Sequence, residues 1–288
     1  MKLHFCLLII TVTLFSSCWK PAYRNIYASQ AANINYFKQK GDSKLTGYYS
    51  GDGKSKNDGY NIQGGYAITN HWALMAAYTF KQEHQTYRYD SVRFRPIGFG
   101  TYEANIFDSS VINYKRNTFE LGLGYILPLN HRKTITYNLY LGISEGKYSI
   151  SDAGLDSKNK NYNRFYNNKI TKYFVQGSFN FMPIDLVHFS IGGKISFLNY
   201  YSVNTSYDSS ELSYFFLDKI PNKTFTIWEP YFNLQFALPK YPWIKMDGQI
   251  SFCSTLYAQY PRTKTFNGSV GLTIELNKLL KKKIKLYL

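Results

Sequence analysis

Residues 59–80 read GYNIQGGYAITNHWALMAAYTF, and large apolar side chains alternate there with small or polar ones on both sides of a short break. A repeat of two residues is the period of a β-strand, so the stretch predicts a hairpin of two strands and not a helix. The fold depends on whether the apolar face of this hairpin contacts a protein core or lipid. That face is formed by Tyr60, Ile62, Tyr66 and Ile68, and after the break by Trp72, Leu74, Tyr78 and Phe80.

The same alternation recurs from Lys44 onward and predicts ten β-strands. In residues 119–125, for example, Phe, Leu and Tyr alternate with Glu and Gly. The expected strands are 44–50, 59–69, 72–80, 114–127, 134–147, 170–182, 188–200, 223–238, 243–254 and 265–276.

The connections between these strands fall into two classes that alternate along the chain. This is the pattern of a transmembrane β-barrel, in which every second connection is a short periplasmic turn and the others are extracellular loops. The short connections are 69–71, 128–132, 182–186 and 239–242, and the polar, mostly long ones are 51–58, 81–113, 148–169, 201–222 and 255–264.

Several of the expected strands reach the 9 to 11 residues that cross a bilayer when tilted. Backbone groups cannot stay unpaired in lipid, so such a sheet must close on itself. We therefore expect an all-β fold, a closed antiparallel transmembrane β-barrel of about ten strands, with the greasy face outward. A soluble β-sandwich would show the same alternation with that face inward. Aromatic residues near strand ends favour the barrel, as interfacial girdles: Trp72, Tyr78, Phe80, Tyr125, Tyr173, Phe181, Phe197, Trp243 and Phe252.

The N-terminus has the features of an export signal. Lys2 precedes an apolar stretch from Phe5 to Phe15 that is too short to span a bilayer. The sequence LFSSC then ends at Cys18 and is typical of a lipobox, in which the cysteine is lipidated and becomes the first mature residue. We expect a lipid anchor at Cys18 on the periplasmic side, and an ordinary secretory signal cut nearby is the alternative.

These features divide the chain into four parts. Residues 1–17 are a lipoprotein signal peptide, 18–43 a mostly irregular periplasmic lead-in, 44–276 the barrel and 277–288 a basic tail. The tail, NKLLKKKIKLYL, holds five lysines that we expect beside the inner-leaflet headgroups.

The chain of 288 residues carries a net charge of +16, which raises the question of nucleic acid. A secreted chain without an RNA-binding motif does not fit that partner, and phosphates of outer-membrane lipids and lipopolysaccharide are the expected anionic neighbours. With Cys6 in the signal and Cys18 in the lipobox, Cys253 is left alone, so no internal disulfide is expected. No metal-ligand spacing is present, and we expect no cofactor.

Strand parity places several charged residues on the polar face and hence in the barrel lumen. Buried charges must pair or reach water, and a ten-stranded barrel is only slightly wider than the eight-stranded size that side chains can fill. Two interpretations stay open: an interior plugged by ion pairs and hydrogen bonds, or a narrow polar conduit. The residues concerned are Glu120, Lys172, Lys194, Glu229, Lys245, Asp247 and Glu275.

The sequence KQKGDSKL, followed by the opening hairpin, resembles the N-terminal signature of uncharacterised outer-membrane β-barrel lipoproteins of the Bacteroidota type. The residues that match are Gly41, Asp42, Ala67, Ile68, Thr69, Asn70 and His71. The resemblance implies a barrel in the outer membrane of a Gram-negative bacterium, delivered by the lipoprotein-transport and barrel-assembly machineries, and no particular activity. The terminal strand also resembles a barrel-assembly signal through Ser269, Gly271, Ile274 and Leu276.

Four functions remain from the sequence alone. The leading hypothesis is a non-catalytic outer-membrane lipoprotein with a structural or surface-interaction role, for an extracellular ligand that the sequence does not identify. A small passive pore comes second. A lipid-directed barrel enzyme is third, because His188 and Ser190 share one strand and one face but no third catalytic residue is evident. A soluble, ligand-binding β-sandwich is fourth.

Overall fold

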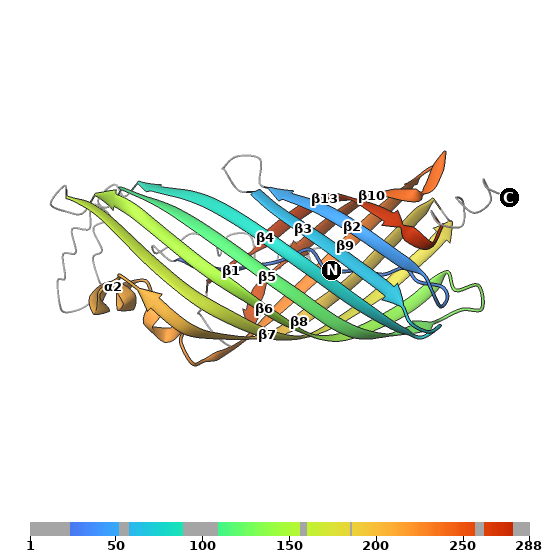
Figure 1. Ribbon diagram of the computed structural model, residues 1–288, viewed down its shortest axis with the longest axis horizontal. Coiled ribbons are helices and arrows are strands. Elements are labelled where there is room, and N and C mark those ends of the chain that lie inside the picture. Colours follow the sequence, from blue (N-terminus) through green and yellow to red (C-terminus); the bar gives the residue numbers. More distant parts are fainter. Residues whose placement is uncertain are drawn as a thin grey trace, which may run out of the picture.

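The computed structural model describes residues 24–51, 58–88, 109–155, 160–184, 186–256 and 262–278, and ten of its strands form one antiparallel barrel (Figure 1). Strand β13 pairs with β2 on one side and with β10 on the other, so the sheet closes. This confirms the predicted fold class. The barrel strands are β2 (Ser43–Gly51), β3 (Asp58–Ala67), β4 (Trp72–Arg88), β5 (Ser109–Pro128), β6 (Ile135–Leu155), β7 (Asn161–Ile184), β8 (Val187–Thr205), β9 (Thr224–Leu238), β10 (Tyr241–Phe252) and β13 (Phe266–Glu275).

The opening hairpin is formed by β3 and β4, which pair from Ala67 opposite Ala73 to Asp58 opposite Gln82. Its greasy residues point away from the barrel, and the polar and small residues between them are buried inside. The outward side chains include Tyr60, Ile62, Tyr66, Trp72, Leu74 and Tyr78, and the inward ones Asn61, Gln63, Ala73, Met75, Ala77 and Thr79.

A belt of exposed apolar side chains surrounds the barrel. On β5 it runs from Phe119 to Leu127, nine residues, which matches the length needed to cross a hydrocarbon layer. Leu141 is 59 % exposed and Tyr173 58 % exposed, which lipid tolerates and water disfavours. The apolar side chains of the belt do not pack against one another in a dry interior, so the β-sandwich alternative is wrong. The architecture is that of an outer-membrane β-barrel.

Most of the aromatic residues expected at the membrane interfaces do lie on the outer surface. Six of the nine are exposed, and Trp72 packs edge-on against Tyr125 close to the short turns, with ring centroids 5.3 Å apart. Phe80, Phe181 and Trp243 are half-buried. No helix among the residues described is long and apolar enough to cross a bilayer.

The short connections gather at one end of the barrel, opposite the end that carries α2 (Ser209–Tyr214) (Figure 1). In the turn between β3 and β4, the Thr69 hydroxyl accepts hydrogen bonds from the backbone N–H groups of His71 and Trp72 at 3.2 and 2.9 Å. Short turns face the periplasm in outer-membrane barrels, so the α2 end is the extracellular end.

Five strands continue well past the apolar belt toward the extracellular end. The predicted strands ended too early there, and the expected loops 81–113, 148–169 and 201–222 are partly strand. We call this part the extension. It consists of residues 81–88 of β4, 109–117 of β5, 145–155 of β6, 161–171 of β7 and 199–205 of β8.

The alternation of polar and apolar residues reverses in the extension. Lys115, Lys147 and Lys169 point outward, whereas many of the inward side chains, such as Tyr114 and Tyr148, are large and apolar and lie among a few buried charged groups. This pattern fits strands that stand in water and share a core, rather than strands in lipid. This reversal explains why the predicted strands ended too early. In the belt the outward residues are apolar, so a stretch with polar outward residues was assigned to a loop.

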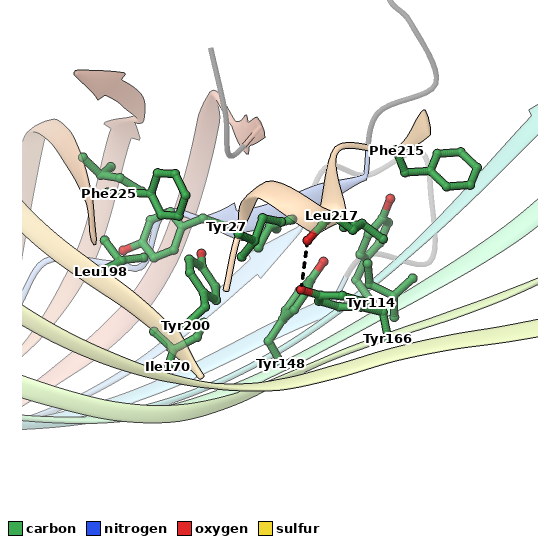
Figure 2. Packing of buried hydrophobic residues seen from close by; sticks show 14 of the residues in the cluster. Tyr27, Tyr114, Tyr148, Tyr166, Ile170, Leu198, Tyr200, Phe215, Leu217 and Phe225 are labelled. Atoms are coloured by element: carbon green, nitrogen blue, oxygen red, sulfur yellow. Dashed lines mark hydrogen bonds between the residues drawn. The ribbon is translucent and has the colours of Figure 1, made fainter. Parts of the chain in front are cut away.

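The core of the extension is an apolar cluster closed by α2 and the short helix η1 (Leu217–Lys219) (Figure 2). Leu217 is fully buried, and its carbonyl oxygen accepts a hydrogen bond from the Tyr166 hydroxyl at 3.4 Å. Helix α2 begins with a capping box between Asp208 and Glu211. The other members of the cluster include Ile26, Tyr27, Ile112, Tyr114, Tyr148, Ile150, Ile170, Leu198, Tyr200, Tyr207, Phe215, Ile220 and Phe225.

The lead-in lies inside the barrel. It was expected on the periplasmic side, but its described part passes through the lumen, where residues 24, 26–29 and 31–37 are buried. It contains β1 (Asn25–Ala28), which pairs in parallel with β12 (Arg262–Lys264). Strand β11 (Ser254–Leu256) continues the pairing with β9. The expected signal peptide, Cys18, and residues 279–288 of the basic tail lie outside the described residues.

Candidate functional site in the barrel lumen

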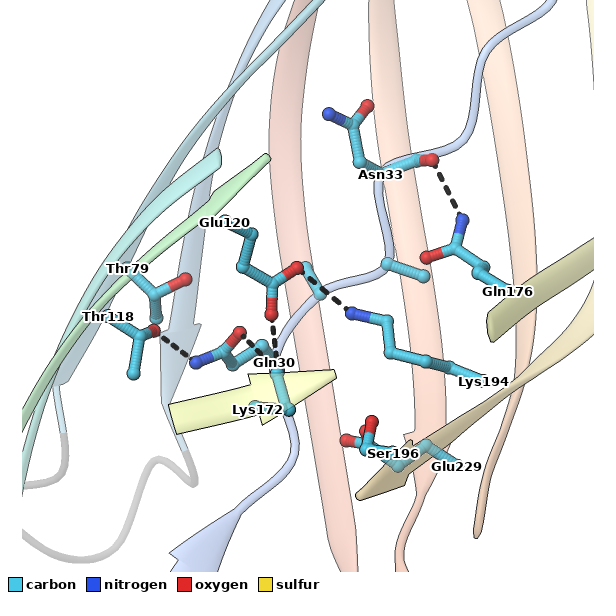
Figure 3. Close-up of polar contacts among 12 residues, drawn as sticks. Gln30, Asn33, Thr79, Thr118, Glu120, Lys172, Gln176, Lys194, Ser196 and Glu229 are labelled. Carbon is cyan, nitrogen blue, oxygen red and sulfur yellow. Dashed lines mark hydrogen bonds and ion pairs between the residues drawn. The ribbon is translucent and has the colours of Figure 1, made fainter. Parts of the chain in front are cut away.

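The centre of the lumen holds a carboxylate shared by two lysines (Figure 3). Glu120 on β5 pairs with Lys172 on β7 and with Lys194 on β8, the latter at 3.1 Å from nitrogen to oxygen. Each of the three residues is at most 2 % exposed. Lys194 also lies over the ring of Phe174, 4.8 Å from its centroid. Closing the ion pairs satisfies charges that would otherwise be costly to bury.

Glu229 on β9 is bound by hydroxyl groups. The Tyr27 hydroxyl donates to its carboxylate at 3.1 Å, and the Ser196 hydroxyl donates to it at 3.2 Å. The ammonium group of Lys172 lies 3.4 Å from the oxygen of Tyr27. Tyr27, a lead-in residue, therefore connects the two acidic groups at the centre of the lumen.

The other predicted lumen charges form a second group near the short turns. Lys245 donates to Glu275 at 2.8 Å and lies 3.0 Å from Nδ1 of His188. Asp247 accepts hydrogen bonds from Asn233, Gln235 and, at 3.1 Å, Thr273. The structure thus places all seven predicted charges on the inner side of the wall, with Glu275 at its rim, but in two groups rather than one site.

The two residues expected of an enzyme form hydrogen bonds with different partners, although both contact Tyr36. His188 faces Lys245, whereas the Ser190 hydroxyl donates to Tyr36 at 2.9 Å and also bonds to Asn180. No group of three His, Cys, Asp or Glu residues is placed to hold a metal ion within the part of the chain that the structure describes.

The lead-in is held along its length by side chains of the barrel wall. Gln30 donates to Thr118, and Gln176 donates to the backbone oxygen of Asn33 at 2.9 Å (Figure 3). The side-chain amide of Asn33 in turn donates to the carbonyl groups of Gly64 and Ala76. The segment consequently fills the lumen as an extended stretch of chain, whose first part is β1.

The extracellular end of the lumen contains a further ion-pair cluster. Arg24 pairs with Asp152 and lies 3.8 Å from the ring centroid of Phe215. The Tyr207 hydroxyl donates to Asp152 at 2.8 Å. Burial raises the pKa of Tyr207 well above its usual value, and Asp152 acts in the same direction, so this hydroxyl keeps its proton.

A second acid at this end, Glu83, is surrounded by cations. Arg116 lies 2.6 Å away, Lys264 3.1 Å and Lys81 3.8 Å. Arg116 also donates to the backbone oxygen of Asn25 at 2.8 Å and so joins this cluster to the lead-in.

These outer charges were not among the predicted lumen residues, and neither was Lys44, which donates to the carbonyl oxygen of Ile34. Lys44 lies two residues before the inward Thr46 on the same strand, so the alternation of the strand could have placed it in the lumen. Glu83 and Arg116 share the inward parity of their strands, but Glu83 was assigned to a loop. Arg24 belongs to a segment without a strand pattern and gave no signal.

Two small cavities border the lead-in among the residues that the structure describes. A cavity of about 50 Å³ lies between Tyr36, His188 and Lys278, and one of about 20 Å³ lies between Gln30 and Lys172. The larger has room for a few water molecules and the smaller for about one. The arrangement of charges, amides and hydroxyls thus acts chemically as a binding site for an extended polypeptide, and the polypeptide is part of the same chain.

No protein-family model matches this chain, and no curated protein matches it either. Among solved structures, the translocator domain of autotransporter NalP from Neisseria meningitidis is similar over 82 % of this chain and 86 % of its own, with 10 % identity and a TM-score of 0.43. The transport unit of autotransporter AIDA-I from Escherichia coli is similar over 92 % of this chain and 96 % of its own, with 9 % identity and a TM-score of 0.40. The attachment invasion locus protein Ail of Yersinia pestis is similar over 58 % of this chain and 92 % of its own, with 16 % identity and a TM-score of 0.28. The resemblance to the Bacteroidota-type lipoproteins stays a prediction.

Proposed function

We propose that this chain is a non-catalytic outer-membrane lipoprotein that presents a folded platform at the cell surface. The observation that carries the proposal is the filled lumen: residues 24–37 occupy it and are bonded to the wall from end to end. A barrel filled in this way is suited to a structural or interaction role, and a passive pore needs the space that the lead-in occupies.

The extension supports the surface-interaction part of the proposal. It projects beyond the apolar belt with a hydrophilic outer face that includes Lys115, Glu145, Lys147 and Lys169. Its core is packed with aromatic residues, so the strands hold their shape without lipid. Functional surfaces of many proteins are loops carried on a rigid scaffold, and the extension provides such a scaffold for the connection 89–108.

The remaining parts of the proposal concern the membrane. The belt contacts acyl chains of the outer membrane and its lipopolysaccharide, Cys18 carries the lipid anchor, and the barrel-assembly and lipoprotein-transport machineries insert the chain.

A test is density fractionation followed by an alkaline carbonate wash, combined with protease treatment of intact cells. We expect retention in the membrane and cleavage within 89–108, and release by the wash would contradict the proposal.

Planar-bilayer recording separates this function from the passive pore. We expect no conductance steps from the purified native barrel. A variant lacking residues 24–37 should conduct, because it loses the segment that fills the lumen, and heat-modifiable mobility on gels shows whether it has folded. Regular steps from the native protein would establish the pore instead, and a changed lipid mass profile in a deletion strain would favour the enzyme.

A further inference from the structure

The lead-in runs through the lumen in one direction, antiparallel to β6. The backbone oxygen of Asn25 accepts a hydrogen bond from Tyr148, and that of Asn35 accepts one from Asn138 at 2.6 Å. Ten residues separate the two positions on the lead-in and ten separate them on β6. The lead-in is therefore fully extended and covers roughly 33 Å, the rise of ten strand residues.

The two ends of this segment are identified by their contacts. Arg24 is bound within the extension, by Asp152 and the ring of Phe215. At the opposite end, the side chain of Lys133, in the short turn between β5 and β6, donates to the backbone oxygen of Lys38 at 2.8 Å. Gly41, at a φ of 85°, then turns the chain into β2. The segment enters at the extracellular mouth and leaves at the short-turn end.

The wall recognises the backbone of the lead-in rather than only its side chains. Amide groups from β3, β10 and β7 donate to three successive carbonyl groups: Gln63 to Ala31 at 2.8 Å, Gln249 to Ala32 at 3.4 Å, and Gln176 to Asn33 at 2.9 Å. Lys44 donates to the next one, that of Ile34. Buried amide and ammonium groups need such partners, so the lining is matched to a resident extended chain.

We infer that the chain threads outward through its own barrel, so that the mature N-terminus and any acyl group on Cys18 lie on the extracellular side. Arg24 begins the described part of the chain and lies at the extracellular mouth, so the polypeptide that precedes it starts from that end of the barrel. Cys18 precedes Arg24 by six positions, a reach of at most about 20 Å. The inference departs from the expected periplasmic anchor, and it rests on the barrel orientation used in the proposed function.

Three epitope insertions test the direction of threading on intact cells. One follows Lys20, one lies within 89–108 as the extracellular control, and one follows His131 in a short turn as the periplasmic control. We expect antibody to bind the first two on intact cells and the third only after permeabilisation. A first tag that needs permeabilisation while the second does not would overturn the threading alone. The reverse behaviour of the two controls would overturn the orientation, and with it the proposed function.

A disulfide tests the position of the segment independently of the cell surface. The hydroxyl oxygens of Ser29 and Ser251 lie 3.0 Å apart, so S29C with S251C should oxidise to a closed loop that migrates differently on a non-reducing gel. Both changes are made with C253A to remove the nearby thiol. The control pairs S29C with S190C, because Ser190 binds Tyr36, seven residues further along, and should not form a bond. A folded, heat-modifiable barrel in which S29C fails to join S251C, or joins S190C equally well, would refute the inference.

Discussion

At the scale of single residues, two neighbouring glycines of β3 face opposite sides of the barrel wall. A Cβ atom on Gly65 would lie 2.2 Å from the amide oxygen of Asn35 and 2.9 Å from the ring of Phe37. A Cβ atom on Gly64 would meet only the carbonyl oxygen of Lys44, at 3.9 Å. The difference shows how closely the lead-in is packed against one face of the wall.

The glycine pair gives the first prediction. Gly65→Val should lower the free energy of unfolding by about 1–3 kcal/mol, the usual cost of overpacking, because the lead-in must shift. Gly64→Val should be close to neutral, since its side chain enters the lipid-facing side of a strand that favours branched residues. Denaturant unfolding in detergent or vesicles measures both. Equal effects of the two substitutions would mean that the lead-in does not rest on Gly65.

The shared carboxylate of Glu120 gives the second prediction. Glu120→Gln leaves Lys172 and Lys194 buried without their anion and should cost about 3–5 kcal/mol of unfolding free energy. The matched control is Glu145→Gln, whose carboxylate is exposed on the outer face beside Thr171 and Tyr201 and should change stability by less than about 1 kcal/mol. A Glu120 variant as stable as the Glu145 variant would show that the two lysines reach water or lose their protons.

At the scale of elements, the extension behaves as a soluble β-structure attached to a membrane barrel. Its strands continue those of the belt without interruption, yet they exchange the roles of their two faces. The belt and the extension therefore depend on different stabilising forces, the first on lipid and the second on its aromatic core.

That difference gives the third prediction. Tyr148→Ala removes a fully buried ring of the extension core and a hydrogen bond to Asn25, so it should cost about 3–5 kcal/mol locally. We expect proteolysis to cut the extension faster while heat-modifiable mobility still reports an intact barrel. Lys147→Ala, on the neighbouring outward position, is the control and should leave the cleavage rate unchanged. Loss of the whole barrel in the tyrosine variant would contradict the separation.

The sequence predicted the belt well and the extension poorly for the same reason. Between Phe119 and Tyr125 the outward residues are apolar and alternate without a break with Glu and Gly, as in a lipid-facing strand. Beyond Glu145 the outward residues become polar, and a continuing strand then resembles a solvated loop. Seven inward charges could be named from parity, whereas the position of the lead-in depends on long-range contacts such as that of Arg24 with Asp152, which no local pattern records.

At the scale of the whole molecule, one strand passes through both environments. The outward face of β6 carries Leu141 in the belt, 59 % exposed, and Ser151 in the extension, also exposed. The same substitution at these two positions therefore compares lipid with water on one continuous surface. This comparison addresses the assumption on which the orientation, the anchor and the threading all depend, namely that the belt lies in a bilayer.

Leu141→Arg should reduce the unfolding free energy in vesicles by about 2–4 kcal/mol, the cost of an arginine on the lipid face of a barrel near the bilayer midplane. Ser151→Arg should change it by less than about 0.5 kcal/mol, because a surface substitution in water rarely matters. Reversible denaturant unfolding from vesicles, followed by tryptophan fluorescence, measures both values. The outward residues of β6 change from apolar at Ile143 to charged at Glu145, so a bilayer that ends there would cover Leu141 and leave Ser151 in water. If Ser151→Arg proved as harmful as Leu141→Arg, the exposed apolar side chains would be covered by something other than lipid.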